Sequence, residues 1–94
     1  MNVYVPQLGE KTGKVLAAVL EQSMDGYGIQ AKTGLNDAEL FAAVQYLKEH
    51  DLIGVEGPFC QEMIRSVYLW VPPGTKGNAQ LALQNRRNQS SQVS

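Results

Sequence analysis

The sequence predicts an α+β domain in which three helices pack against a small antiparallel β-hairpin. Leu40, Val44 and Leu47 follow one another at i, i+4 and i+7, a spacing that places apolar side chains on one face of a helix. A glycine-containing turn at residues 33–35 separates this helix from a shorter segment before it. Two aliphatic runs within residues 53–71 follow the helix and are typical of paired strands. Together these signals predict two helices joined by a tight turn and followed by a hairpin.

The longest predicted helix covers residues 37–50 and has clear signals at both ends. Asn36 is a favourable N-cap, and Glu39 lies three residues later, so the pair can form a capping box. Asp37 lies in the first turn and Lys48 in the last, where the helix dipole favours each charge. We therefore expect this helix to be well defined.

The other elements are shorter and are expected on either side of this helix. A run of β-favouring residues within residues 1–7 could add an edge strand to the sheet. Residues 74–94 are rich in Asn, Gln, Ser and Gly, and this composition predicts a flexible polar tail. The expected helices and strands are helix 12–23, helix 27–32, strand 53–56 and strand 64–71.

The composition is that of a small globular protein of the cytoplasm. The 94 residues suit one domain, with 44% hydrophobic and 18% charged residues. A formal net charge of −1 supplies no overall positive field for nucleic acid. The single cysteine excludes an internal disulfide and fits a reducing compartment. We expect no membrane span and no signal peptide, because no apolar run of about 20 residues occurs and the first residues lack a basic, then apolar, pattern.

No motif in the sequence predicts an enzyme, a metal site or a cofactor. His50 and Cys60 could be imagined as a nucleophilic pair, but nothing indicates an orienting group or an oxyanion hole. Glu62 adds no spacing typical of a closed metal site. Gly9 and Gly13 are separated by three residues rather than the four of a phosphate-binding loop. We therefore expect a non-enzymatic protein without a bound cofactor.

The order of helix, glycine turn, second helix and apolar hairpin resembles the winged helix-turn-helix superfamily. The resemblance covers roughly residues 10–72 and is carried by Thr33-Gly34-Leu35-Asn36, then Leu40, Val44 and Leu47, then Asp51-Leu52-Ile53. It implies a three-helix core with a β-wing, over residues 8–73. It also implies a small transcriptional regulator that binds double-stranded DNA, with helix 37–50 in the major groove and wing 53–71 on the DNA backbone. For a module of this size and charge, we expect a homodimer.

The resemblance also assigns candidate DNA contacts to residues of this chain. Amide side chains can pair with adenine, and apolar side chains can contact the thymine methyl, while basic and hydroxyl side chains contact phosphate. The expected base-facing residues are Asn36, Asp37, Phe41, Ala42 and Gln45. The expected phosphate contacts are Lys32, Thr33, Arg65 and Lys76, with Arg86 and Arg87 as further basic residues beyond the wing.

The charge pattern supports an alternative hypothesis, a protein-interaction adaptor. The expected recognition helix has no arginine on its outward side, and it begins with Asp37 and Glu39, whose carboxylates would lower affinity for a phosphate-lined groove. Phe41, Tyr68 and Trp70 could instead form an exposed aromatic surface of the kind found at interface anchors. The exposure of Phe41 discriminates between the two hypotheses.

Overall fold

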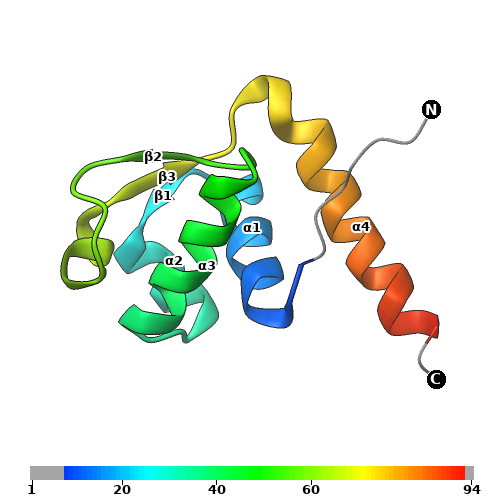
Figure 1. The fold of residues 1–94 in the computed structure, drawn as a ribbon, viewed down its shortest axis with the longest axis horizontal. Coiled ribbons are helices and arrows are strands. Elements are labelled where there is room, and N and C mark those ends of the chain that lie inside the picture. Colours follow the sequence, from blue (N-terminus) through cyan, green and yellow to red (C-terminus); the bar gives the residue numbers. More distant parts are fainter. Residues whose placement is uncertain (1–7, 93–94) are drawn as a thin grey trace.

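The structure is a computed structural model that describes the backbone of residues 8–92 and the side chains of residues 8–86. The edge strand expected within residues 1–7 lies outside the described residues. Three helices form the body of the molecule (Figure 1): α1 (Glu10–Glu21), α2 (Gly26–Thr33) and α3 (Asp37–Glu49). These helices agree with the predicted ones to within about two residues at each end, the ordinary uncertainty of helix ends.

A three-stranded antiparallel sheet lies beside the ends of the helices. Its strands are β1 (Met24–Asp25), β2 (Gly54–Glu56) and β3 (Tyr68–Trp70), in the order β1-β3-β2. The β2–β3 hairpin was predicted, whereas β1 was expected to be only the end of the first helix. β1 adds the third strand by pairing Met24 with Leu69 and Asp25 with Tyr68.

The predicted return strand 64–71 is too long. Its first part belongs to a 3-10 helix, η1 (Gln61–Ser66), and the ladder begins only at Tyr68. Ile64 lies on this short helix and is fully buried. Its apolar side chain therefore contributes to the core and does not indicate a strand. Gly26 explains the close approach of η1, because a Cβ atom there would lie 2.1 Å from the Ile64 carbonyl oxygen.

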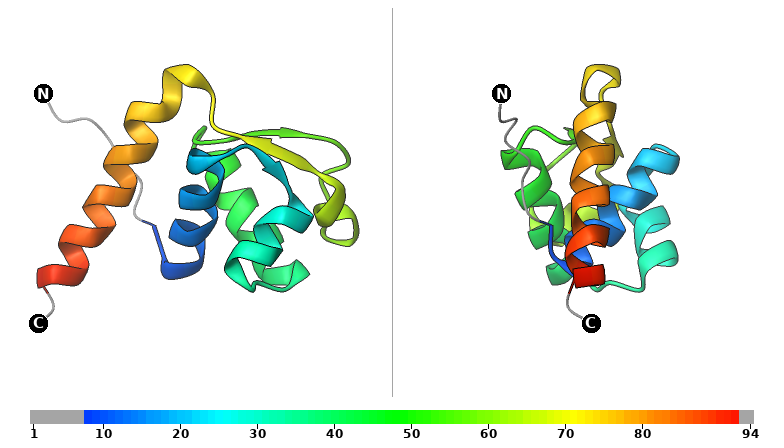
Figure 2. Two further views of the ribbon diagram at one scale, coloured as in Figure 1. Left: turned by 180° about the vertical axis from the view of Figure 1, so that it is seen from behind. Right: turned by 90° about the vertical axis from the view of Figure 1, so that its right-hand side faces the viewer.

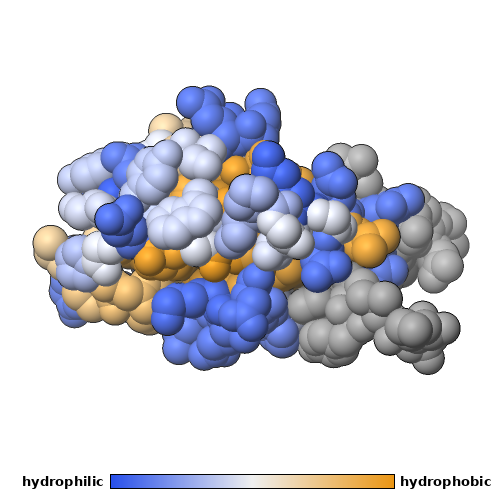
Figure 3. Space-filling model, turned by 90° about the horizontal axis from the view of Figure 1, so that it is seen from above, coloured by the Kyte–Doolittle hydropathy of each residue, from blue (hydrophilic) through white to orange (hydrophobic). Residues whose placement is uncertain are grey.

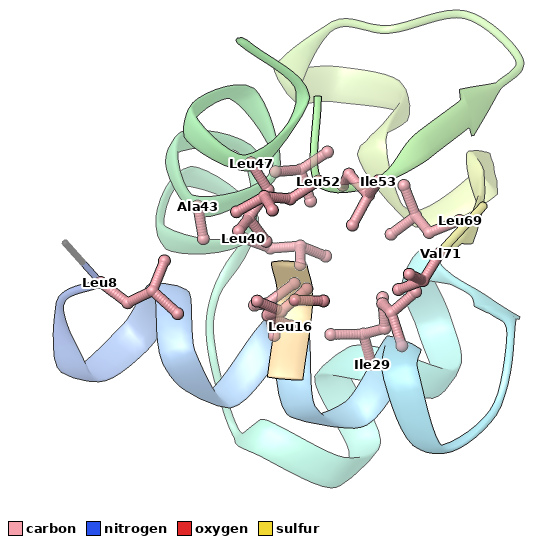
Figure 4. Close-up of a cluster of buried hydrophobic side chains, with 14 of the residues drawn as sticks. Leu8, Leu16, Ile29, Leu40, Ala43, Leu47, Leu52, Ile53, Leu69 and Val71 are labelled. Carbon is pink, nitrogen blue, oxygen red and sulfur yellow. The ribbon is translucent and has the colours of Figure 1, made fainter. Parts of the chain in front are cut away.

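The hydrophobic core fills the space between the three helices and the sheet (Figure 4). Leu40, Val44 and Leu47 are fully buried, as their spacing predicted. From the sheet, Leu69 and the flanking Val67 and Val71 are also buried, so the aliphatic side of the return segment covers the helices as expected. A helix-turn-helix unit followed by an antiparallel hairpin on one shared core is the architecture of a winged helix-turn-helix domain.

The prediction of a flexible polar tail is wrong for residues 76–92, which form the helix α4 (Lys76–Gln92) after the short turn η2 (Pro73–Thr75). α4 packs beside α1 and extends past the body of the molecule (Figure 2). Ala79 and Ala82 lie one turn apart and are fully buried. The composition did not indicate this helix because only two small side chains are needed to pack it closely against α1. The helix itself is favoured by the surrounding Gln, Leu and Arg residues, which have good helix propensity.

Candidate nucleic-acid interface

The turn between α2 and α3 depends on one glycine in a left-handed conformation. Gly34 has a φ of 75° and is the C-cap of α2, with its N–H donating to the Gln30 carbonyl at 2.8 Å. The Thr33 hydroxyl donates to the Ile29 carbonyl at 2.8 Å and accepts from the Leu35 N–H at 3.3 Å. The chain thereby reverses within two residues and presents the start of α3 next to α2.

The capping box predicted at the start of α3 is present. The Asn36 side chain accepts from the Glu39 N–H at 2.8 Å, and the Glu39 carboxylate accepts from the Asn36 N–H at 3.1 Å. Asn36 is exposed, but its amide oxygen is occupied by this cap. Its amide N–H groups are the part of the side chain that remains for a ligand.

Asp37 and Arg65 were assigned to different kinds of DNA contact, and the structure joins them to each other. The Arg65 guanidinium donates from Nε to Asp37 Oδ1 at 2.8 Å and from Nη2 to Asp37 Oδ2 at 3.0 Å. The Gln30 amide donates to Asp37 Oδ1 at 2.6 Å. Arg65, and then Gln30, lower the pKa of the Asp37 carboxyl below its ordinary value. Both Asp37 oxygens are therefore turned towards protein groups.

Glu39 is neutralised in a similar way from α1. Lys11 Nζ lies 2.6 Å from Glu39 Oε2, and Lys11 followed by the Asn36 N–H lowers the pKa of the Glu39 carboxyl. Glu39 in turn raises the pKa of the Lys11 ammonium. The two acids at the start of α3 are thus matched by two basic groups that come from η1 and α1.

The outer side of α3 carries a stripe of small and amide side chains. Ala38, Ala42 and Gln45 are all exposed, and their spacing places them on one face, opposite Leu40 and Leu47. α3 lies at the front of the molecule in Figure 1, and the exposure of these three side chains shows that this face is open to solvent within the described part of the chain. The Gln45 amide donates to Glu49 only at a long 3.4 Å.

A shallow hollow of about 450 Å³ borders this stripe between α1 and α3. Its floor is mainly apolar and its rim holds the Lys11–Glu39 ion pair. The residues that line it are Lys11, Thr12, Ala38, Glu39, Ala42, Ala43 and Tyr46. The hollow widens the surface available to a ligand that contacts α3.

Phe41 is half-buried, and its ring packs against the loop between β2 and η1 rather than against the first helix. Its ring stacks on Phe59 with centroids 4.8 Å apart, and Lys48 Nζ lies 5.3 Å from the centroid of the Phe59 ring. Sequence reasoning missed Phe59, because its place in a loop gave no periodic signal. The three side chains join α3 to the loop between β2 and η1.

The remaining candidate contacts are spread over the molecule. Lys32 and Thr33 lie at the end of α2, next to the turn, and Lys32 Nζ is 3.8 Å from Glu21 Oε2. Lys76 begins α4, at the opposite end of the molecule from the α2–α3 turn (Figure 1). Arg86 lies against α1, with its Nε donating to the Gly9 carbonyl at 3.2 Å. The structure therefore brings together the contacts around α3 but not Lys76 or Arg86.

Tyr68 and Trp70 lie side by side on the solvent face of the sheet. Tyr68 is 44% exposed and Trp70 is half-buried, and their ring centroids are 6.2 Å apart. Phe41 lies elsewhere, on α3 against Phe59. The aromatic surface of the alternative hypothesis is thus divided into two separate clusters.

Among the described residues, no group of three or more histidine, cysteine, aspartate or glutamate side chains could hold a metal ion. Within the same part of the chain, no helix is both long and apolar enough to cross a membrane.

A comparison with solved structures identifies a similar fold. The chain matches a structure of ZitR from Lactococcus lactis, solved as a point mutant, with a TM-score of 0.66 and 17% sequence identity. The match covers 99% of this chain and 62% of that chain, so this chain spans less than two thirds of the length of the ZitR chain. This likeness shows the winged helix-turn-helix fold. No known protein family and no curated protein matches the sequence.

Proposed function

We propose that this protein is a small transcriptional regulator that binds double-stranded DNA through α3. The observation that carries the proposal is the exposed stripe Ala38, Ala42 and Gln45 on the second helix of the helix-turn-helix unit. The two alanines permit close approach to base edges and can contact a thymine methyl, while the Gln45 amide can pair with adenine. Gln45 is the side chain to which we assign sequence preference.

The two acidic residues at the start of α3 should repel DNA less than the sequence alone suggests. Asp37 is paired with Arg65, and Glu39 with Lys11, so two negative charges are balanced by two positive ones. The phosphate backbone would meet a locally neutral helix start rather than two free carboxylates. This balance removes repulsion without adding attraction, so we assign the attraction to other basic groups.

We assign a phosphate contact to Lys32, which lies beside the turn that leads into α3, and not to Thr33, whose hydroxyl already donates to the Ile29 carbonyl. Arg65, from η1, lies beside the first turn of α3. Its guanidinium is hydrogen-bonded to Asp37, so any contact that it makes with phosphate would be made by a cation already paired with a carboxylate. A single copy therefore offers few phosphate contacts, and we propose that two copies bind two half-sites on one duplex.

The proposal is tested by fluorescence anisotropy of a labelled mixed-sequence duplex titrated with the full chain. Binding should be measurable at about 50 mM salt and weaken by roughly tenfold or more at about 200 mM, because counterions are released from each neutralised phosphate. Sedimentation of the complex should show two copies per duplex. An absence of binding even at the lower salt concentration would refute the proposal.

Two variants locate the interface. Gln45→Ala should reduce the preference among duplex sequences, with about 1–3 kcal/mol of discrimination lost at one base pair. Gln80→Ala is the matched control, since Gln80 is an exposed glutamine on α4. If both variants kept the wild-type sequence preference, the assignment of Gln45 would be wrong.

A further inference from the structure

The solvent face of the sheet places an exposed tyrosine between two carboxylates. In the β-ladders, Tyr68 on the central strand is paired with Asp25 of β1 on one side and with Glu56 of β2 on the other. Directly paired residues of antiparallel strands project to the same face. All three are exposed, whereas the next residue along the central strand, Leu69, is fully buried. The solvent face is therefore acidic on both sides of an aromatic ring.

Trp70 extends this aromatic surface along the same strand. It is paired with Gly54, and the edge of its indole lies over that glycine, so that a Cβ at residue 54 would be 2.3 Å from the ring. The absence of a side chain at Gly54 leaves room for the indole next to Tyr68. Figure 3 views the molecule from above, where pale and orange side chains occupy the middle of the surface and blue ones border it.

The two carboxylates are not neutralised within the described part of the chain. Asp25 accepts the Gly28 N–H at 2.9 Å with one oxygen as the N-cap of α2, and neither Asp25 nor Glu56 forms an ion pair there. The guanidinium nearest in sequence to Tyr68, that of Arg65, is engaged by Asp37. The two carboxylates beside the exposed Tyr68 ring thus have no ion-pair partner among the described residues. At the other end of the face, Trp70 lines a hollow together with Glu21 and Lys76, one acid and one base.

We propose that this face, formed by Asp25, Gly54, Glu56, Tyr68 and Trp70, binds a basic peptide segment of a partner protein through an arginine side chain. A guanidinium stacked on the Tyr68 ring would gain a cation–π interaction. Neighbouring strands lie about 4.8 Å apart, so the same guanidinium would be within reach of a carboxylate on either adjacent strand. Charge complementarity selects a basic partner, and it disfavours a phosphate backbone at this face.

This surface is separate from the stripe on α3, so the proposal does not depend on DNA binding. A regulator could bind DNA through one surface and a partner through the other. The two proposals therefore fail independently: a variant of the sheet face should lose peptide binding while its affinity for duplex is retained.

Fluorescence of Trp70, the only tryptophan in the chain, provides the readout. The probe is a short synthetic peptide of alternating arginine and glycine, titrated into the full chain. Its matched control is the same peptide with citrulline in place of arginine, which keeps the planar shape but not the charge. We expect a saturable change with the arginine peptide that is absent with citrulline. Equal binding of the two peptides would overturn the proposal.

Variants then distinguish binding at this face from non-specific attraction of the peptide to acidic residues elsewhere on the protein. Asp25→Asn combined with Glu56→Gln should weaken binding by about fivefold or more, the order expected when an exposed cation–π pair loses its carboxylates. Asparagine still caps a helix, so α2 is preserved. The charge-matched control combines Glu10→Gln with Glu49→Gln on α1 and α3, and it should bind as wild type. If both double variants lost affinity equally, the binding would be non-specific and the proposal would be wrong.

The role of the Tyr68 ring is tested with the same peptide titration. Tyr68→Phe should retain binding, because the aromatic face remains, whereas Tyr68→Thr should lose it while keeping a residue that favours a strand. Retention by the threonine variant would contradict the role assigned to Tyr68.

Discussion

Arg65 donates two parallel hydrogen bonds to Asp37, of 2.8 and 3.0 Å, and so links the short helix before β3 to the first turn of α3. The two residues are separated by 28 positions in the sequence. Bidentate pairing of this kind fixes orientation as well as charge. Its consequence is that a residue expected to repel DNA and a residue expected to attract it act together as one neutral unit.

The Asp37 pair predicts a pH-dependent contribution to stability. The pKa of Asp37 is lowered in the folded protein by Arg65 and then Gln30, so folding favours the ionised carboxylate. The contribution is fully present above the ordinary carboxyl pKa of about 4 and is lost as the pH falls through the lower pKa of the folded state. Urea unfolding should show Asp37→Asn less stable than wild type at pH 7, with a smaller difference at pH 3.

The control for this prediction is Glu62→Gln, because Glu62 is exposed and forms no ion pair within the described residues. The control should match wild type at both pH values. A stability difference for Asp37→Asn that persisted unchanged at pH 3 would show that the carboxylate charge is not its source.

The same pair predicts a non-additive effect on DNA affinity. Arg65→Ala leaves an unpaired carboxylate on α3 and should weaken duplex binding, whereas Arg65→Ala with Asp37→Asn removes both charges and should recover most of the loss. Anisotropy titrations of the two single variants and the double variant measure the coupling. If the double variant bound as weakly as Arg65→Ala alone, Arg65 would act by contacting phosphate directly.

The sequence was most informative where one local rule decides the structure. Asn36 and Glu39 form the predicted capping box, which joins neighbours in the sequence. The stripe of Leu40, Val44 and Leu47 is buried as predicted, because the spacing that marks the apolar face of a helix is a local signal. The β2–β3 hairpin followed similarly from two aliphatic runs. Such features need no knowledge of the rest of the chain.

Apart from the short helix η1, the features that the sequence did not predict depend on distant partners. The strand β1 exists because Met24 meets Leu69, and the stacking of Phe59 on Phe41 and the Arg65–Asp37 pair also join residues far apart in the chain. Residues 76–92 were predicted to be a tail because Ala79 and Ala82 become buried only when α4 packs on α1. Local composition contains no signal for these contacts.

The left-handed turn predicts opposite effects for two glycine substitutions. Gly34 has a φ of 75° and nothing within 4 Å of a Cβ, so Gly34→Ala adds only backbone strain and should cost about 1 kcal/mol. Gly77 also has open space around it but lies within α4, where alanine should stabilise by up to about 1 kcal/mol. Chemical denaturation measures both. A stabilising Gly34→Ala would contradict the left-handed conformation.

The packing of α4 predicts a contrast within one helix. Ala82 is fully buried, so Ala82→Asp places an unpaired charge against α1 and should cost more than about 2 kcal/mol. Gln80→Asp introduces the same side chain at an exposed position of α4 and should cost much less. Thermal unfolding followed by circular dichroism distinguishes them. Equal melting temperatures would mean that α4 does not pack on α1.

The loop between β2 and η1 should be energetically coupled to α3 through Phe41 and Phe59. Their rings stack with centroids 4.8 Å apart, and aromatic pairs contribute about 0.5–1.5 kcal/mol beyond the area they bury. Unfolding of Phe41→Leu, Phe59→Leu and the double variant should therefore give a coupling energy in that range. Phe41→Leu paired with Tyr27→Leu is the control cycle, because Tyr27 is 58% exposed and is not stacked on Phe41 in the described structure. Equal coupling in both cycles would mean that the loop is not held on α3 by this stack.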